Sequence, residues 1–168
     1  MGLFKRLRNL VSKPEPLPAE RSLLTLGPGD VCEVSLVTYQ IIGRTQNPRR
    51  RSVILTLQDG ADIRYLQIEE RERTAFVLYQ PIDGRLDSIE EVPMTLELDG
   101  RVYHLEEQYA GFMRSTGKTP FMQDGEQSVW QFQSDDMKRL RIEWMDGRFT
   151  LYEGEDVLPA DVQTIRAQ

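Results

Sequence analysis

The chain has 168 residues, of which 39% are hydrophobic, and its formal net charge is −6. This length suits one globular domain that buries a core without needing disulfides or metal ions. The composition excludes a mostly disordered chain, and no apolar run approaches the roughly 20 residues that cross a bilayer. The single cysteine, Cys32, favours a reducing compartment, so we expect a cytoplasmic protein.

Residues 1–13 have the pattern of a basic amphipathic helix. Prolines at alternate positions in residues 14–22 then predict an extended connector. Such an arm suits an anionic membrane surface or a protein partner. It also fits a loose terminus that folds back onto the domain. The residues expected to make a membrane or partner contact are Leu3, Phe4, Lys5, Arg6, Leu7, Arg8 and Leu10.

The charge is unevenly distributed along the chain. Outside residues 1–13 the chain has 17 basic and 27 acidic residues, a net charge of −10. Nucleic-acid binding depends on neutralising phosphates, so this acidic body should repel nucleic acid.

Residues 23–168 have the pattern of a β domain, with short stretches of Val, Ile, Thr and aromatic residues between turn formers. After the turn at 27–30, alternation predicts that Cys32, Val34 and Leu36 share an apolar face. A second stretch follows as far as Ile42, and two strands or one long bent strand fit equally well.

Three Asp-Gly pairs predict hairpins. Asp59-Gly60 separates strands over 51–58 and 62–69, and a further strand is expected over 74–80. A turn at Asp99-Gly100 pairs Leu96 with Tyr103 and Met94 with Leu105. A turn at Asp146-Gly147 pairs Trp144 with Phe149 and Ile142 with Leu151.

The two halves of the domain, 23–92 and 93–165, resemble each other. Segments 51–53, 66–69 and 76–79 recur in order as 127–129, 140–143 and 149–152. A duplicated unit would explain this, and so would convergent strand chemistry. We therefore predict an all-β, mainly antiparallel fold. In it, two similar β-meander halves pack as a sandwich or as partly open barrels, preceded by a short N-terminal amphipathic helix.

Three segments resemble the bacterial family named domain of unknown function 4178. They are 26–31 (Leu-Gly-Pro-Gly-Asp-Val), 39–43 (Tyr-Gln-Ile-Ile-Gly) and 63–69 (Ile-Arg-Tyr-Leu-Gln-Ile-Glu), and the likeness extends from about residue 23 to residue 160. The family commonly has Trp in its first long strand, where this chain has Ile54 and has Trp130 in its second half. The resemblance implies a bacterial, non-secreted β domain and supplies no activity, catalytic residue or cofactor.

No set of residues with the spacing of a catalytic or metal site emerges. His104, the only histidine, is expected on a solvated strand face opposite Thr95, and Cys32 on an apolar face. One His and one Cys cannot build a His/Cys zinc site. Residues 116–119 resemble the end of a phosphate-binding loop, but Phe112 stands where that motif needs Gly, which favours a polar loop. We expect no enzyme activity, no cofactor and no metal.

Two charged clusters remain. The acids Asp83, Asp87, Glu90 and Glu91 lack the alternating spacing of a calcium loop, which favours a solvated connector. A basic patch in a hairpin loop is expected to be solvated, with an anion or partner contact as the alternative, and its members are Arg44, Arg49, Arg50 and Arg51. Trp144 is expected in the core beside Phe149, and the place of Trp130 stays open.

Three functional hypotheses follow. The first is a non-catalytic β-rich binding or adaptor module, peripheral at the inner membrane surface through its arm and selecting cationic or protein ligands with its acidic body. The second is a small-molecule-binding protein or enzyme with a pocket between the β halves. The third is a self-associating structural domain that pairs exposed strand edges.

Overall fold

The computed structural model describes residues 23–84, 86 and 88–165. These residues form an all-β, antiparallel fold, as predicted, and include no α-helix. The helix predicted over residues 1–13 lies outside the described part. The strands are β1 (Val31–Val34), β2 (Val37–Asn47), β3 (Ser52–Asp59), β4 (Asp62–Glu70), β5 (Thr74–Ile82), β6 (Thr95–Leu98), β7 (Arg101–Gly117), β8 (Gly125–Ser134), β9 (Lys138–Met145), β10 (Arg148–Val157) and β11 (Val162–Ile165). Three short 3-10 helices accompany them: η1 (Leu23–Thr25), η2 (Ile89–Glu91) and η3 (Pro159–Asp161).

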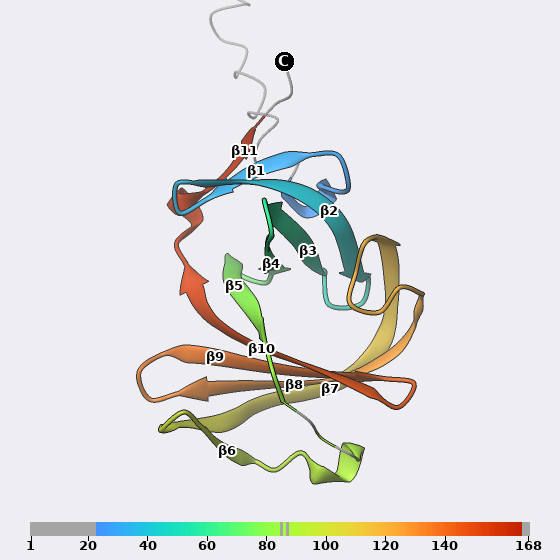
Figure 1. Cartoon of the computed structure of the whole chain (residues 1–168), viewed down its shortest axis with the longest axis vertical. Helices are drawn as coiled ribbons and strands as arrows, with labels where there is room; N and C mark the ends of the chain where they lie inside the picture. Colours follow the sequence, from blue (N-terminus) through green and yellow to red (C-terminus); the bar gives the residue numbers. More distant parts are fainter. Residues whose placement is uncertain (1–22, 85, 87, 166–168) are drawn as a thin grey trace, which may run out of the picture.

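All the strands belong to one sheet, with the order β11-β1-β2-β3-β4-β5-β10-β9-β8-β7-β6 (Figure 1). A further pairing between β2 and β7 joins the eight strands from β2 to β7 in that order into a ring. The sheet bends sharply where β5 pairs with β10, because β10 runs from the lower to the upper part of the molecule. The protein is therefore one continuous sheet, partly closed on itself.

The predicted hairpins form, with one change of turn. Asp146-Gly147 joins β9 to β10 and sets Trp144 opposite Phe149 and Ile142 opposite Leu151. Asp146 and Gly147 have φ values of 50° and 80°, which a two-residue turn with left-handed central residues requires. Asp99-Gly100 likewise sets Leu96 opposite Tyr103. The prediction for the first turn is wrong by one residue, because Asp59 pairs with Asp62 and residues 60–61 form the loop.

The segment after residue 30 forms two strands rather than one bent strand. Cys32 and Val34 on β1 are buried, as expected. Leu36 was expected on the same face but is 90% exposed. Ser35 and Leu36 both have positive φ and form the β1–β2 turn, so the strand alternation ends at Val34.

Apolar side chains gather in two separate cores. The first contains buried residues of β1 to β5 and β11, among them Cys32, Leu55 and Leu66. The second contains Tyr103, Trp130, Phe132, Leu140 and Ile142 from β7, β8 and β9. Trp144 and Phe149 pack against the second core, as predicted for Trp144. Trp130, which the sequence analysis did not assign, is a core residue. The cores follow the two halves in most residues, although β11 of the second half adds Val162 to the first core.

The strand register aligns the residues of the two halves differently from the sequence comparison. Ile68 faces Val53 in the first half, and Ile142 faces Trp130 in the second. Val53, and not Ile54, therefore corresponds to Trp130. On their other side, Ile68 pairs with Phe76 of β5 and Ile142 pairs with Leu151 of β10. Phe76 therefore corresponds to Leu151, so the third matched segment is displaced by two residues. Side chains keep their faces under such a shift because alternation has a period of two.

Candidate functional site

Polar side chains occupy the inside of the ring between the two cores. We define the polar seam as Tyr65, Tyr79, Tyr109, Gln127, Arg141, Glu143 and Tyr152. Alternation explains it, because Leu66, Leu140 and Ile142 enter the cores while their neighbours on the same strands point the other way. The Tyr152 ring lies edge-on to the rings of Tyr65 and Tyr79, with centroids 5.0 and 6.3 Å away. The seam therefore connects the halves through aromatic contacts.

A buried ion pair lies in the middle of the polar seam. The Arg141 Nε donates to Glu143 Oε2 at 2.8 Å, and Arg141 Nη1 donates to the Tyr109 hydroxyl at 3.2 Å. Burial by itself lowers the pKa of Arg141, but Tyr109 and Glu143 outweigh it and raise that pKa above its ordinary value. Thr150 Oγ1 donates to Glu143 Oε1 at 3.2 Å. Both charges are thus held by fixed partners, which limits the cost of burying them.

Four charged side chains close a second network at one end of the seam, and we call it the charge ring. Arg50, in the β2–β3 turn, contacts Glu69 at 3.1 Å and Glu107 at 2.6 Å. Arg71, in the β4–β5 turn, contacts Glu69 at 2.9 Å and Glu107 at 3.0 Å. The Arg50 guanidinium also lies 3.8 Å from the centroid of the Tyr109 ring. Since Glu69 is on β4 and Glu107 on β7, the charge ring joins the two halves.

A groove of about 430 Å³ opens beside the charge ring, and we call it the seam groove. Its lining residues come from β4 and β5 in the first half and from β7, β8, β9 and β10 in the second. Its polar lining includes Gln67, Glu69, Arg71, Glu106, Glu107, Gln131, Arg139 and Asp156. Its apolar lining is Ala75, Phe76, Val77, Val157 and Pro159, with Tyr79 from the polar seam. Volumes of this order are typical of small-ligand sites.

The buried amide of Gln67 lines this groove. Its side-chain Nε2 donates to Glu69 Oε2 at 3.2 Å. Its oxygen, Oε1, is buried and has no hydrogen-bond partner among the groups that the structure describes. Exchanging the two amide atoms would set oxygen against the Glu69 carboxylate, so the contact with Glu69 determines the orientation.

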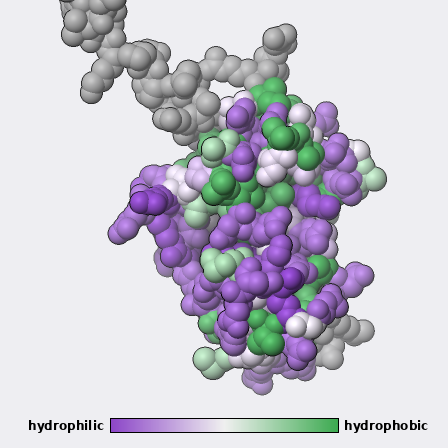
Figure 2. Space-filling view, turned by 90° about the vertical axis from the view of Figure 1, so that its left-hand side faces the viewer, coloured by the Kyte–Doolittle hydropathy of each residue, from purple (hydrophilic) through white to green (hydrophobic). Residues whose placement is uncertain are grey.

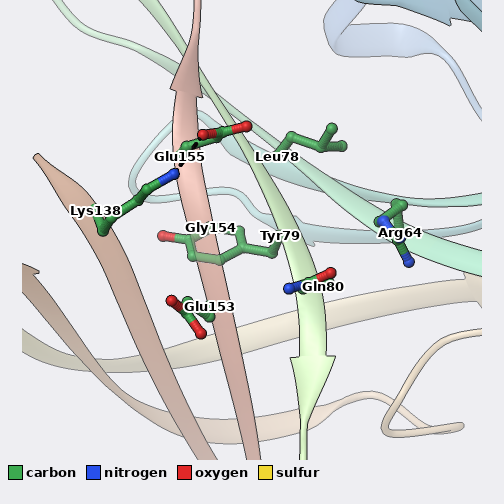
Figure 3. Close-up of a pocket in the computed structure, with 8 residues that line it drawn as sticks. All are labelled: Arg64, Leu78, Tyr79, Gln80, Lys138, Glu153, Gly154 and Glu155. Carbon is green, nitrogen blue, oxygen red and sulfur yellow. Dashed lines mark hydrogen bonds and ion pairs between the residues drawn. The ribbon is translucent and has the colours of Figure 1, made fainter. Parts of the chain in front are cut away.

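A smaller depression of about 160 Å³ lies where β5 and β10 meet (Figure 3). Lys138 Nζ contacts Glu155 Oε2 at 2.7 Å there, while Arg64 lies at the opposite side. Gly154 faces Tyr79 across the strand pair, and a Cβ on Gly154 would come within 2.6 Å of the Tyr79 ring. The glycine thus lets the Tyr79 ring lie against β10, so Tyr79 lines both this depression and the seam groove.

Comparison with known proteins identifies the family. The model of one family, Domain of unknown function (DUF4178), matches residues 27–159. The chain belongs to the DUF4178 family. No curated protein and no solved structure matches the chain. The part of the DUF4178 domain that forms the seam groove, from β4 to β10, lies inside the matched range.

The arginines of the predicted basic patch do not gather in the DUF4178 domain. Arg50 joins the charge ring, and Arg51 contacts Glu70 at 3.0 Å in the open. Arg44 donates from Nη2 to the Leu24 carbonyl at 2.7 Å, away from the turn. Arg49 is exposed. The other predicted contact residues, Leu3, Phe4, Lys5, Arg6, Leu7, Arg8 and Leu10, lie outside the described part.

The other singled-out residues are scattered over the DUF4178 domain. Cys32 is fully buried in the first core, and burial raises the pKa of its thiol to about 11. His104 lies opposite Thr95, as predicted, with Nε2 3.9 Å from Asp135 Oδ1. Gly117 ends β7, and Thr119 Oγ1 donates to the Phe121 carbonyl, so residues 116–119 lead into no helix. Asp87 is outside the described part, and Glu90 lies in η2.

Two negative findings hold for the described part of the DUF4178 domain. No group of three or more His, Cys, Asp or Glu residues there could hold a metal ion. No helix there is long and apolar enough to cross a membrane. In the view of Figure 2 the described surface is mostly hydrophilic, and hydrophobic residues gather mainly near its upper end.

Sequence reasoning missed the residues that line the seam groove. The sequence analysis assigned no role to Glu69, Glu107 or Arg139, because the sequence does not show which strands face one another. One signal was available. Gln67 and Glu69, and likewise Arg141 and Glu143, alternate with the apolar positions 66, 68, 140 and 142, and four polar residues on the inner faces of central strands predict a polar interior.

Proposed function

We propose that this protein is a non-catalytic binding module that holds its ligand in the seam groove. One observation carries the proposal: both halves of the fold line the same groove, and one lining residue, Gln67, has a buried acceptor oxygen without a partner among the described groups. Buried polar atoms without partners are rare in folded proteins, and one that belongs to the lining of a groove supports a binding role. This proposal joins the binding-module hypothesis to the expected pocket between the halves.

The arrangement of reactive groups supports a binding role over a catalytic one. A nucleophilic cysteine needs a base close to it, and in this chain the only histidine would have to be that base. Cys32 is enclosed in the first core, whereas His104 is exposed beside the second. The groove carboxylates Glu69, Glu106, Glu107 and Asp156 each contact an arginine, so each is already held in an ion pair.

A similar arrangement of the two halves supports a duplicated origin, which we also propose. Glu69 and Glu143 each bind a polar residue two positions earlier on the same strand, Gln67 and Arg141 respectively. Both pairs point toward the inside of the ring, beside an apolar core of their own half. A groove between two copies of one unit is a common place for a binding site.

A second role rests on the sequence of the arm. Its apolar residues at helical spacing and its four bases support reversible attachment to an anionic membrane surface. We propose that the arm brings the domain to the inner face of the bacterial membrane. The single cysteine supports a cytoplasmic location.

Ligand screening by NMR tests the binding role. The ¹⁵N-labelled full chain would be titrated with small amines, carboxylic acids, sugars and nucleosides. We expect at least one class to shift the Gln67 side-chain amide and the Val77 backbone signal in a saturable way. Ala75, exposed on β5, lines the groove, so Ala75→Trp should abolish the shifts by filling it.

The control is Ala110→Trp, at an exposed position of β7 that does not line the groove. This variant should bind as the wild type does. Absence of saturable shifts with every probe class, or equal binding by Ala75→Trp, would rule out the seam groove as a binding site.

A further inference from the structure

Each arginine that lines the seam groove is already paired with two carboxylates. Arg139 donates from Nε and Nη2 to Asp156 and from Nη1 to Glu106, at 3.0 to 3.3 Å. Arg71 donates from Nε to Glu69 and from Nη2 to Glu107. An anionic ligand that approached either arginine would be repelled by the carboxylates beside it, so the groove is poorly suited to anions.

Acceptors, in contrast, remain in excess. Four carboxylates line the groove, namely Glu69, Glu106, Glu107 and Asp156, against the two arginines Arg71 and Arg139. Counting Arg50, the other arginine of the charge ring, still leaves one negative charge in excess. Each carboxylate oxygen has two lone pairs and can accept further bonds beyond those to arginine. The groove therefore favours a ligand that brings donors and positive charge.

Gln67 indicates where in the groove such a donor would bind. The amide is only 3% exposed, and its free Oε1 can be satisfied only by a donor. Because Nε2 is held by Glu69, the amide cannot turn to offer a donor instead. A ligand donor at Gln67 Oε1 would lie close to the Glu69 carboxylate, which stabilises a charged donor more than a neutral one.

Arg71 already shows which chemistry fits between the two glutamates. Its side chain is 59% exposed and comes from a short turn, yet its guanidinium spans Glu69 and Glu107. It thus behaves as an internal cation on a site that the fold itself provides. An incoming cation would compete with Arg71 for the same oxygens.

The remaining walls fit an aliphatic stem. Val77, Val157 and Pro159 line the groove next to the charged groups, with Phe76 buried beneath them. Lysine side chains bury their methylene stems on such surfaces while the ammonium group reaches polar partners. An ammonium group on a hydrocarbon stem matches both parts of the lining.

On the basis of the proposed function, we infer that the seam groove binds a primary ammonium group on an aliphatic stem, with Gln67 Oε1 and Glu69 as its acceptors. Such a group occurs in free alkylamines and in lysine side chains of proteins. Both sources offer the same ammonium group and stem, and separate probes distinguish them.

The test uses the ¹⁵N-labelled full chain at low ionic strength, titrated with n-butylammonium and with butyrate as the anion of equal length. Only butylammonium should shift the Gln67 amide. Gln67→Met removes the acceptor at equal side-chain length and should weaken butylammonium binding about tenfold or more. Gln80→Met, on the exposed side of β5 outside the groove, should bind as the wild type does.

A second variant tests the site without touching the buried amide. Arg71→Ala removes the competing guanidinium from an exposed turn and should tighten butylammonium binding. A blocked lysine tripeptide is then compared with one in which norleucine, which has the same stem without nitrogen, replaces lysine. Tighter binding of the lysine peptide than of butylammonium assigns the site to a protein partner, and weaker binding assigns it to a free amine.

The results separate this inference from the proposed function. Saturable binding of butyrate, a sugar or a nucleoside in the seam groove, without binding of butylammonium, would overturn the ammonium assignment and leave the binding role intact. Unchanged butylammonium affinity in Gln67→Met would also overturn it. Loss of every ligand signal overturns both.

Discussion

Gly43 of β2 lies directly opposite Gly117 of β7 at the point where the ring closes. A Cβ on Gly43 would lie 1.8 Å from the Lys118 carbonyl oxygen, and one on Gly117 would lie 2.4 Å from the Ile42 carbonyl oxygen. Backbone from β2 and β7 therefore approaches more closely here than any side chain allows. Without this approach the two ends of the ring could not pair, and the seam groove would lose its fixed shape.

Gly43→Ala should therefore destabilise the protein by about 2 kcal/mol or more, since the clash is with backbone and cannot be relieved by a side-chain rotation. Urea unfolding followed by tryptophan fluorescence measures the change. Gly27→Ala is the control, because the nearest atom to its added Cβ is 3.8 Å away. Equal stability of the two variants would show that the ring does not depend on this contact.

The buried pair Arg141–Glu143 makes a second prediction. Glu143→Leu leaves the Arg141 charge buried without its carboxylate, which should cost about 3–5 kcal/mol. The double variant Arg141→Met with Glu143→Leu removes both charges and should recover much of that loss. Denaturant unfolding of the three proteins forms the comparison. If the double variant were as unstable as the single one, packing rather than the unpaired charge would be the cause.

Cys32 predicts a pH dependence. Its thiol has a pKa of about 11 in the native protein, raised by burial, whereas an unfolded cysteine ionises near about 8.5. A raised native pKa means that the unfolded state loses the proton first, so the contribution of Cys32 to stability is full below about pH 8.5. It falls as the pH rises toward 11.

Unfolding experiments at pH 8 and pH 10 with the wild type and Cys32→Ala test this. The wild type should lose more stability than the variant between these values. Tyrosine ionisation affects both proteins alike and cancels in the comparison. The native thiol should also react slowly with iodoacetamide at pH 8. A rapid reaction, or equal losses in the two proteins, would contradict the burial of the thiol.

The arm makes a prediction about membranes. Full-length protein should sediment with vesicles that contain anionic phosphatidylglycerol at low salt, because four bases contribute about 1 kcal/mol each. Protein lacking residues 1–13 should remain in the supernatant, and so should the full chain at high salt. Neutral phosphatidylcholine vesicles serve as the control. Equally poor sedimentation of both proteins with anionic vesicles would remove the membrane role.

Much of the local structure could be predicted because it depends on neighbours in the chain. Asp146-Gly147 and Asp99-Gly100 determine their turns through left-handed backbone angles, and the register of each hairpin follows. The burial of Cys32 and Val34 follows from strand alternation. The prediction that Leu36 shares this face was wrong because strand alternation ends where the strand ends.

Long-range pairing is a different matter. The pairing of β5 with β10 and of β2 with β7 joins residues about 70 to 80 positions apart, and no short motif encodes it. The charge ring exists only through this pairing, since Arg50 and Arg71 acquire Glu107 as a partner from another part of the chain. Arg50, expected in a solvated patch, became part of the charge ring for that reason.

The sequence alone thus determined the all-β class, the hairpins, the lack of a recognisable catalytic motif and the family resemblance. These depend on turn chemistry, on a period of two and on composition. Tertiary structure alone decided that two apolar cores enclose a polar interior and that Gln67 and Glu69 line a shared groove. The physical reason is that a side chain's face is set locally, whereas what it faces depends on which distant strand lies across from it.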